Sequence, residues 1–215
     1  MKILNFGSLN IDYVYSVDHF VQKGETISSS QMNIFSGGKG LNQSVALGRA
    51  GAKVFHGGRI GKGGEFLVEQ LKESGVNTDL VVLDEGCSTG HAIIQNDAEG
   101  DNCILLYGGA NQRITKEQID DTLSHFEAGD YVVLQNEINN LPYLMEKAAK
   151  KQMNIVLNPS PMDEKIKALP LDKVTLFFVN EIEAAQILGE KELESTEKAV
   201  KAFQDMFPKA AVVLT

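Results

Sequence analysis

The chain has 215 residues, of which 43% are hydrophobic and 23% are charged, and its formal net charge is −9 at pH 7. This length and composition are typical of one large globular domain, or of one domain with a small appendage. The negative charge argues against non-specific binding to nucleic acid or to anionic membranes. No apolar run approaches the roughly 20 residues that span a bilayer, and the N-terminus is too poor in apolar residues for a signal peptide. Because Cys87 and Cys103 belong to no CxxC pair, we expect free thiols and a cytoplasmic location.

Hydrophobic periodicity predicts both strands and helices along the whole chain. The predicted strands are Ile3–Phe6, Ile11–Val17, Met32–Phe35, Lys53–His56, Leu80–Leu83, Thr89–Gln95, Asn102–Tyr107, Tyr131–Gln135, Ile155–Asn158, Thr175–Val179 and Ala211–Leu214. The predicted helices are Leu41–Ala50, Glu65–Ser74, Lys116–Phe126, Leu141–Lys151, Ile182–Leu188 and Thr196–Met206. The glycine-rich stretch 57–64 predicts a loop, and Thr115 with Gln118 predicts a capping box.

From residue 110 onward, strands and helices alternate regularly. This rhythm predicts a mostly parallel sheet with helices on both faces, an α/β fold. The strands 11–17, 32–35, 89–95 and 102–107 do not fit the rhythm. We expect them to leave the main sheet and to pair as a small separate sheet, a lid. The lid would come from about residues 11–36 and 88–107 of one α/β domain spanning residues 1–215.

Three glycines surround Lys39 in the segment Ser36–Gln43, just before a predicted helix. Glycine is costly in regular structure, so its clustering indicates a place where something approaches the backbone closely. One interpretation is a tight strand-to-helix turn with a solvated lysine. The other is a cradle for an anionic or hydroxylated ligand, because a helix N-terminus offers free N–H groups and a partial positive charge.

Other polar residues follow predicted strands, at the edge where open α/β sheets bind ligands. Asn10 and Asp12 share one face of an extended segment, and an amide beside a carboxylate suits vicinal hydroxyls; a polar loop with an Asx turn is the alternative. Asn180 and Glu183 have helix-capping spacing, and Glu183 also suits an outer ligand of a hydrated Mg²⁺. Two further polar segments, 135–137 and 158–161, end apolar strands.

Patterns of several common sites do not occur in the chain. There is no GxxxxGK[ST], GxGxxG, HExxH or GxSxG pattern. The four histidines lie far apart without ligand spacing, which indicates surface or structural roles for most of them.

In their order and spacing, the polar segments resemble the ribokinase branch of the PfkB carbohydrate kinases. The segments that carry the resemblance are Asn10-x-Asp12, Gly37-Gly38-Lys39-Gly40-x-Asn42-Gln43, Gly108-Gly109-Ala110-Asn111, Glu137, Asn158-Pro159-Ser160-Pro161 and Asn180-x-x-Glu183. The resemblance implies a three-layer αβα fold with a small β-sheet lid, which is often the dimer contact in the family. It also implies transfer of the γ-phosphoryl group of ATP to a sugar hydroxymethyl group.

The resemblance implies a role for each matching residue. The sugar hydroxyls would be held by Asn10, Asp12, Gly38, Lys39, Asn42 and Glu137. Asn180 and Thr215 would lie beside the nucleotide, and Glu183 would help to hold Mg²⁺ through water. The adenine pocket and a K⁺ site would come mostly from residues beyond Thr215.

Two residues and the end of the chain depart from the family pattern. Lys62 stands where an acidic residue is usual, and His91 occupies a lid position that is commonly aliphatic, either contacting the substrate or facing solvent. The chain ends within Ala211–Thr215, a strand that we expect to be fully buried, and it has no Gly-Ala-Gly-Asp segment with the family's general base. We therefore expect the N-terminal portion of a kinase, inactive by itself and without a catalytic residue.

Three functions remain open at this point. The first is an ATP-dependent kinase for the hydroxymethyl group of a ribose-like pentose. The second is a non-catalytic protein that binds sugars or nucleosides on a kinase scaffold. The third is a nucleoside kinase on the same scaffold.

Overall fold

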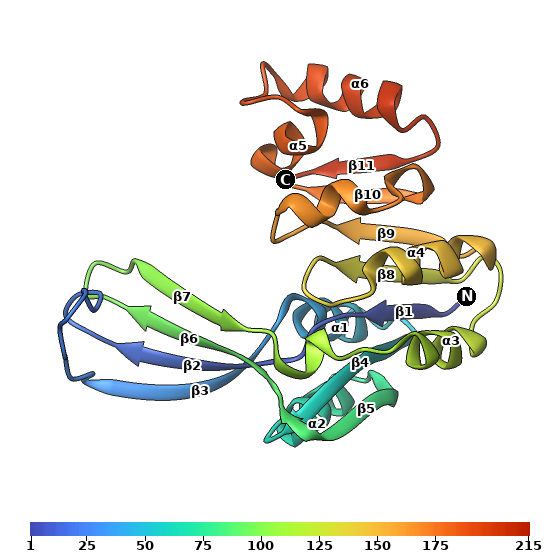
Figure 1. Ribbon diagram of the computed structural model, residues 1–215. Helices are drawn as coiled ribbons and strands as arrows, with labels where there is room; N and C mark the ends of the chain where they lie inside the picture. The colour runs from blue at the N-terminus through green and yellow to red at the C-terminus, as the bar shows by residue number, and fades with distance from the viewer.

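The computed structural model describes residues 1–215, which form two β-sheets. The larger sheet has 7 strands in the order β11–β10–β9–β8–β1–β4–β5, and every neighbouring pair is parallel. Its strands are β1 (Ile3–Phe6), β4 (Val54–Lys62), β5 (Asn77–Ser88), β8 (Tyr131–Gln135), β9 (Asn154–Asn158), β10 (Leu176–Val179) and β11 (Ala211–Leu214). Because all strands run in one direction, their carboxyl ends meet at a single edge of the sheet (Figure 1).

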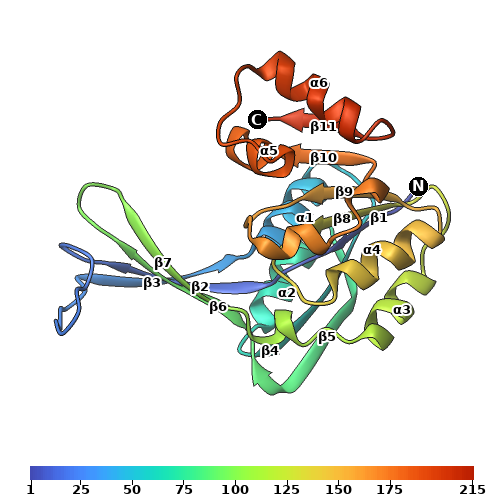
Figure 2. The same ribbon diagram turned by 45° about the horizontal axis from the view of Figure 1, so that its top comes forward.

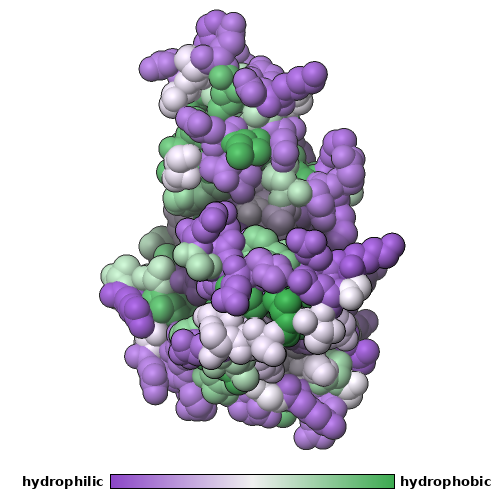
Figure 3. All heavy atoms as spheres, turned by 90° about the vertical axis from the view of Figure 1, so that its left-hand side faces the viewer, coloured by the Kyte–Doolittle hydropathy of each residue, from purple (hydrophilic) through white to green (hydrophobic).

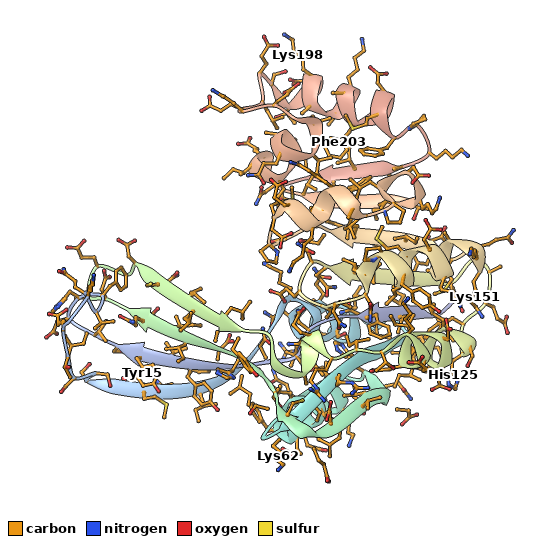
Figure 4. The ribbon with its side chains drawn as sticks, in the orientation of Figure 1. Tyr15, Lys62, His125, Lys151, Lys198 and Phe203 are labelled. Carbon is orange, nitrogen blue, oxygen red and sulfur yellow. The ribbon has the colours of Figure 1, made fainter.

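Helices cover both faces of this sheet and complete three layers (Figures 1 and 2). One face carries α1 (Lys39–Arg49) and α2 (Glu65–Glu73). The other carries α3 (Lys116–Ser124), α4 (Leu141–Lys150), α5 (Glu181–Leu188) and α6 (Thr196–Met206). Phe203 of α6, labelled in Figure 4, packs against Phe177 of β10 with ring centroids 5.5 Å apart. The predicted αβα architecture is confirmed.

The smaller sheet consists of β2 (Asn10–Ser16), β3 (Gln31–Gly37), β6 (Gly90–Asn96) and β7 (Asn102–Tyr107). Its order is β3–β2–β6–β7, with two antiparallel outer pairs and a parallel central pair. It projects from the edge where the main strands end (Figures 1 and 2). The four strands predicted to leave the main sheet therefore do so, and we call this sheet the lid.

The glycine-rich stretch after His56 belongs to β4, so the predicted loop at 57–64 is wrong for most of its length. Gly57 pairs with Phe6 of β1, and a Cβ atom on Gly57 would lie 2.9 Å from the Phe6 ring. A Cβ atom on Gly61 would lie 2.3 Å from the carbonyl oxygen of Cys87. These glycines permit close approach of neighbouring groups within a strand, a use that sequence composition does not distinguish from a loop.

The predicted capping box on α3 is half formed. Thr115 Oγ1 accepts a hydrogen bond from the Gln118 backbone N–H at 3.1 Å. The Gln118 side chain does not return to the cap; it donates to the Gly58 carbonyl at 2.7 Å and accepts from Arg59 Nε at 3.0 Å. Arg59 also pairs with Asp84 at 3.0 Å. This network, rather than the cap alone, joins α3 to β4 and β5.

Asp84 is expected to stabilise the fold in a pH-dependent way. A hydrogen bond from Arg113 is the main cause that lowers the pKa of Asp84 to about 2, with help from the Gly86 N–H and Arg59. Because the folded pKa lies below the unfolded one, this stabilisation is fully present above the unfolded pKa and is lost as pH falls through about 2. We expect Asp84→Asn to lower Tm at pH 7 and to match the unsubstituted chain near pH 2, measured by thermal unfolding across this range. Asp79→Asn, a carboxylate without an ion pair, is the control; equal Tm values for Asp84→Asn and the unsubstituted chain at pH 7 would contradict the expectation.

The last strand, β11, lies at the edge of the sheet rather than in its middle, so the expectation of a fully buried strand is wrong. Val213 is 38% exposed and Phe178 on the neighbouring strand is 39% exposed. Both side chains lie on the face of the sheet that carries α1. Beside α1 on this face, an apolar groove of about 380 Å³ runs over β8, β9 and β10. None of the helices combines the length and the apolar character that crossing a bilayer requires.

Candidate functional site

The first turn of α1 is seated directly on the turn that follows β1. The Leu41 N–H donates to the Ser8 carbonyl at 2.9 Å, and the Gly40 N–H donates to Ser8 Oγ at 3.2 Å. A Cβ atom on Gly40 would lie 2.4 Å from the Ser8 nitrogen, and Gly38 has φ +94°, a left-handed conformation that favours glycine. The group that approaches these glycines closely is thus the chain's own backbone.

A carboxylate also contacts the first turn of α1 and the turn after β1. Glu137, which follows β8, accepts a hydrogen bond from the Lys39 N–H at 2.9 Å through Oε2, and the Ser8 hydroxyl donates to the same oxygen. The N–H groups of Lys39, Gly40 and Leu41 therefore all have partners within the protein. The structure favours the tight turn over an open cradle of free N–H groups. Glu137 Oε1 has no partner.

Two charged side chains beside this turn have no partner of opposite charge. Asp12 on β2 and Lys39 at the start of α1 are both half-buried, and neither forms an ion pair or a side-chain hydrogen bond. Burial raises the pKa of Asp12, and the negative charge of Glu137 raises it further. Unpaired, partly desolvated charges are typical of places where a ligand supplies the missing partner.

The remaining predicted sugar-binding residues lie around the same turn. Asn10 begins β2, is 4% exposed, and accepts a hydrogen bond from Asn111 through its side-chain oxygen. Gly38 lies against it, since a Cβ atom on Gly38 would be 3.2 Å from the Asn10 nitrogen. Asn42 is exposed in the first turn of α1, and its side chain makes no hydrogen bond. The structure thus brings all six residues to the end of the lid next to the main sheet, where Asn10 pairs with Gly37, and we call this end the root of the lid. Asn42 is the most peripheral of the six.

The predicted nucleotide and metal residues line a neighbouring pocket of about 270 Å³. Its lining residues are Lys39, Asn158, Ser160, Phe178, Val179, Asn180, Glu183 and Thr215. Lys39 is common to the two groups: its N–H contacts Glu137, and the residue also borders this pocket. The two predicted half-sites are therefore contiguous through one lysine.

Asn180 and Glu183 form a complete capping box at the start of α5. The Asn180 N–H donates to Glu183 Oε2 at 3.0 Å, and the Glu183 N–H donates to Asn180 Oδ1 at 2.8 Å. This explains one oxygen of Glu183; the other has no partner in the protein. No cluster of three or more acidic, histidine or cysteine side chains surrounds it. One available carboxylate oxygen at a pocket fits a hydrated Mg²⁺, which keeps most of its waters.

His91 does not face the candidate site. In the lid it pairs with Ile11, whereas Asp12 pairs with Ala92, so His91 and Asp12 lie on opposite faces. Its ring is half-buried between Tyr13, at a centroid distance of 5.9 Å, and Tyr107, at 5.0 Å. Both alternatives from the sequence are thereby replaced by a packing role. Lys62, labelled in Figure 4, is exposed at the end of β4.

Sequence reasoning missed a buried polar chain beneath α1. Asn5 Nδ2 donates to the Gly40 carbonyl at 2.7 Å and to Ser44 Oγ at 2.8 Å, and Ser44 contacts His56 Nδ1 at 2.7 Å. Gln135 Nε2 donates to Asn5 Oδ1 at 2.8 Å. Burial lowers the pKa of His56 to about 4, so the ring is neutral at pH 7. The feature of the sequence that could have predicted this buried chain is the presence of polar residues at inward-facing positions of otherwise apolar strands.

A comparison with protein families agrees with this fold. The sequence pattern of the pfkB family carbohydrate kinases matches residues 1–215, and the chain belongs to this family. The ribokinase of Staphylococcus aureus (strain COL) is 34% identical over 199 residues, which cover 88% of this chain and 64% of that protein. The chain therefore spans just under two thirds of the length of that relative.

Solved structures agree with this assignment. The ribokinase of Arabidopsis thaliana, solved with ribose and ATP, has a TM-score of 0.84 and 26% identity; the match covers 99% of this chain and 71% of that one. The ribokinase of Cryptococcus neoformans var. grubii serotype A, solved with ADP, has a TM-score of 0.79 and 32% identity, covering 100% and 72%. The ribokinase-like fold expected from the sequence is confirmed.

Proposed function

We propose that this chain carries the sugar-binding part, and a portion of the nucleotide-binding part, of an ATP-dependent kinase for a ribose-like pentose. The observation that carries the proposal is the pair of unpaired charges, Asp12 and Lys39, at the root of the lid beside a pocket bordered by Glu183. The ribose and ATP bound to the Arabidopsis relative support the choice of ligands.

In this proposal the sugar lies between the lid root and the start of α1. Asp12 and the free oxygen of Glu137 accept hydrogen bonds from vicinal hydroxyls, while Asn10, Lys39 and Asn42 donate to hydroxyl oxygens. Gly38 allows the sugar to lie against the backbone. Two carboxylates in one small site favour a ligand that is rich in donors, as a pentose is.

The phosphate end of the nucleotide would lie in the pocket bordered by Asn180 and Thr215, with Lys39 between nucleotide and sugar. Glu183 would hold a hydrated Mg²⁺ through water, and the ion would neutralise charge on the transferred phosphoryl group. The hydroxymethyl oxygen would form a bond to the γ-phosphorus, the bond from the γ-phosphorus to the bridging oxygen of the β-phosphate would break, and ADP would leave. The hydroxyl proton would go to a general base, which is not assigned to any residue of this chain. A K⁺ ion is a further proposed cofactor, but no residue of this chain is proposed to bind it.

The 215 residues contain no Gly-Ala-Gly-Asp segment, and no residue of this chain is proposed as the general base. A general base contributes roughly 10²–10⁴-fold to rate. We therefore expect no measurable D-ribose phosphorylation by this chain with MgATP in a coupled ADP-release assay. Turnover near that of a complete kinase would refute this part of the proposal.

Calorimetric titration of the chain with pentoses, hexoses and nucleosides tests the sugar site itself. We expect binding of D-ribose, weaker binding of hexoses and none of inosine. Preferential binding of a nucleoside would favour the nucleoside-kinase alternative. Ribose binding without turnover, also in a longer chain that carries the family's Gly-Ala-Gly-Asp segment, would favour a non-catalytic sugar-binding protein. Absence of heat with every sugar would refute the proposal.

We also propose that the lid mediates a homodimer. Large apolar side chains are exposed on both of its faces: Phe35 and Leu106 on the face of Asp12, and Ile34 and Leu105 on the other. Figure 3 shows hydrophobic side chains, in green, on the side toward which the lid projects. Exposed apolar surface of this extent is typical of an interface.

Charge substitutions on each lid face test the dimer. We expect the unsubstituted chain to sediment as a dimer and either Leu105→Glu or Leu106→Glu to sediment as a monomer, because a buried charge at an interface is costly. Lys151→Glu, at the far end of the molecule (Figure 4), changes the charge without touching the lid and serves as the control. A monomeric unsubstituted chain, or dimers of both lid variants, would contradict the proposal.

We also propose a cytoplasmic location, which the free thiols and the proposed use of ATP support.

A further inference from the structure

Asn111 uses every polar group of its side chain inside the protein. It lies 1% exposed in the short 3-10 helix η1 (Gly109–Gln112), beside the root of the lid. Its Oδ1 accepts from the Leu9 N–H at 3.0 Å, and its Nδ2 donates to the Asn10 side-chain oxygen at 2.7 Å and to the Leu9 carbonyl at 3.3 Å. No part of Asn111 remains available for a ligand.

These contacts determine which way the Asn10 amide points. A backbone N–H can only donate, so the Leu9 N–H requires the oxygen of Asn111 and turns its nitrogen toward Asn10. Asn10 must then offer its own oxygen to Asn111. The Asn10 Nδ2 group has no partner in the protein, and it is not among the side-chain atoms that are both buried and unpaired. It therefore remains available as a donor.

The contact between the two side chains is packed closely against the backbone of Gly90. A Cβ atom on Gly90 would lie 2.2 Å from Asn111 Nδ2 and 2.4 Å from the Asn10 side-chain oxygen. The same short helix also holds the loop after β8, because Gln112 Nε2 donates to the Glu137 carbonyl at 2.9 Å. One segment thus restrains two of the proposed sugar-binding residues.

We propose that Asn111 is a positioning residue that orients the Asn10 carboxamide as a hydrogen-bond donor toward the sugar. Asn111 acts through Asn10 and touches no ligand itself. The ligand atom opposite Asn10 must then be an acceptor, such as a hydroxyl or ring oxygen. This inference rests on the proposed function, because it assumes that the sugar binds at this site.

The Asn111→Asp variant reverses the polarity of the contact. A carboxylate still accepts from the Leu9 N–H, but it has no proton for Asn10, so the Asn10 amide is expected to rotate and to present its oxygen to the ligand. We expect D-ribose to bind roughly 10- to 100-fold more weakly in calorimetry, the loss of one well-placed hydrogen bond. Asn139→Asp is the matched control, because Asn139 clamps the Ile114 backbone in the same way, at 3.0 Å and 2.9 Å, without contacting Asn10.

A double-mutant cycle separates positioning from general destabilisation. If Asn111 acts through Asn10, then Asn111→Asp should change ribose affinity by less than about 2-fold in an Asn10→Ala background, because the losses at coupled sites are not additive. Additive losses, or ribose affinity of Asn111→Asp equal to that of the unsubstituted chain, would overturn the proposal.

A measurement without sugar distinguishes this inference from the proposed function. We expect the Asn10 side-chain amide protons, followed by NMR hydrogen exchange, to exchange quickly in the unsubstituted chain and slowly in Asn111→Asp. Unchanged exchange would overturn the positioning role even if ribose binds. Absence of ribose binding to the unsubstituted chain would refute the proposed function, while the exchange result would still decide the orientation of Asn10.

Discussion

Replacing Asp12 with alanine is expected to weaken D-ribose binding by about 100- to 10,000-fold. A hydrogen bond to a charged group contributes about 1.5–3 kcal/mol, and a carboxylate that holds two vicinal hydroxyls makes two of them. Asp12 has no partner in the protein to compensate, and it lies half-buried on the lid strand β2. Calorimetric titration of both chains with D-ribose measures the change directly.

The Asp12→Asn variant separates a loss of ribose binding from a loss of stability. Because the folded pKa of Asp12 is raised, the ionised carboxylate destabilises the ligand-free fold at neutral pH. Removing the charge should therefore raise Tm at pH 7 while weakening ribose binding. The gain in Tm should disappear as pH falls through the raised pKa, where the native carboxyl is protonated as well. If both variants bind ribose with an affinity within 3-fold of the unsubstituted chain, Asp12 is excluded from the site. A 3-fold change corresponds to only about half of the 1.4 kcal/mol that a tenfold change represents.

The second large effect is expected for Gly40→Ala, which should lower Tm by roughly 4–8 °C, the shift for a net loss of about 2 kcal/mol. A Cβ atom on Gly40 would lie 2.4 Å from the Ser8 nitrogen and 2.6 Å from the Gly7 carbonyl carbon, and neither backbone atom can rotate away. Lifting α1 off this turn would break the Gly40 and Leu41 hydrogen bonds to Ser8. Overpacking of this kind costs about 3 kcal/mol, more than the roughly 1 kcal/mol that alanine gains over glycine within a helix.

Gly75→Ala is the matched control for Gly40→Ala. Gly75 has φ +77° and nothing within 4 Å of an added Cβ atom, so its substitution carries only the conformational cost of about 1–2 kcal/mol. Thermal and urea unfolding of the three chains should rank Gly40→Ala as the least stable. A Tm for Gly40→Ala at or above that of the unsubstituted chain would show that α1 is not seated as the structure has it.

Much of the fold follows from periodicity along the chain. The strands Ile3–Phe6, Asn102–Tyr107 and Tyr131–Gln135 and the helix Thr196–Met206 have the bounds that the sequence predicts. The separation of the lid strands from the main sheet was also predictable, because their spacing breaks the alternation of strand and helix. The glycines of β4 were misinterpreted, since close packing and loop formation both favour glycine.

Sequence alone decided the order of the elements, the family and the kinds of side chain at the carboxyl edge of the sheet. Only the tertiary structure showed that Glu137 meets the Lys39 N–H across 98 positions, that Asn111 meets Asn10 across 101, and that His91 faces away from Asp12. Hydrophobic periodicity is a local property of the chain, whereas the partner of a polar group is chosen by how distant strands come to lie side by side. The orientation of each side chain in the candidate site therefore depends on packing that no local pattern encodes.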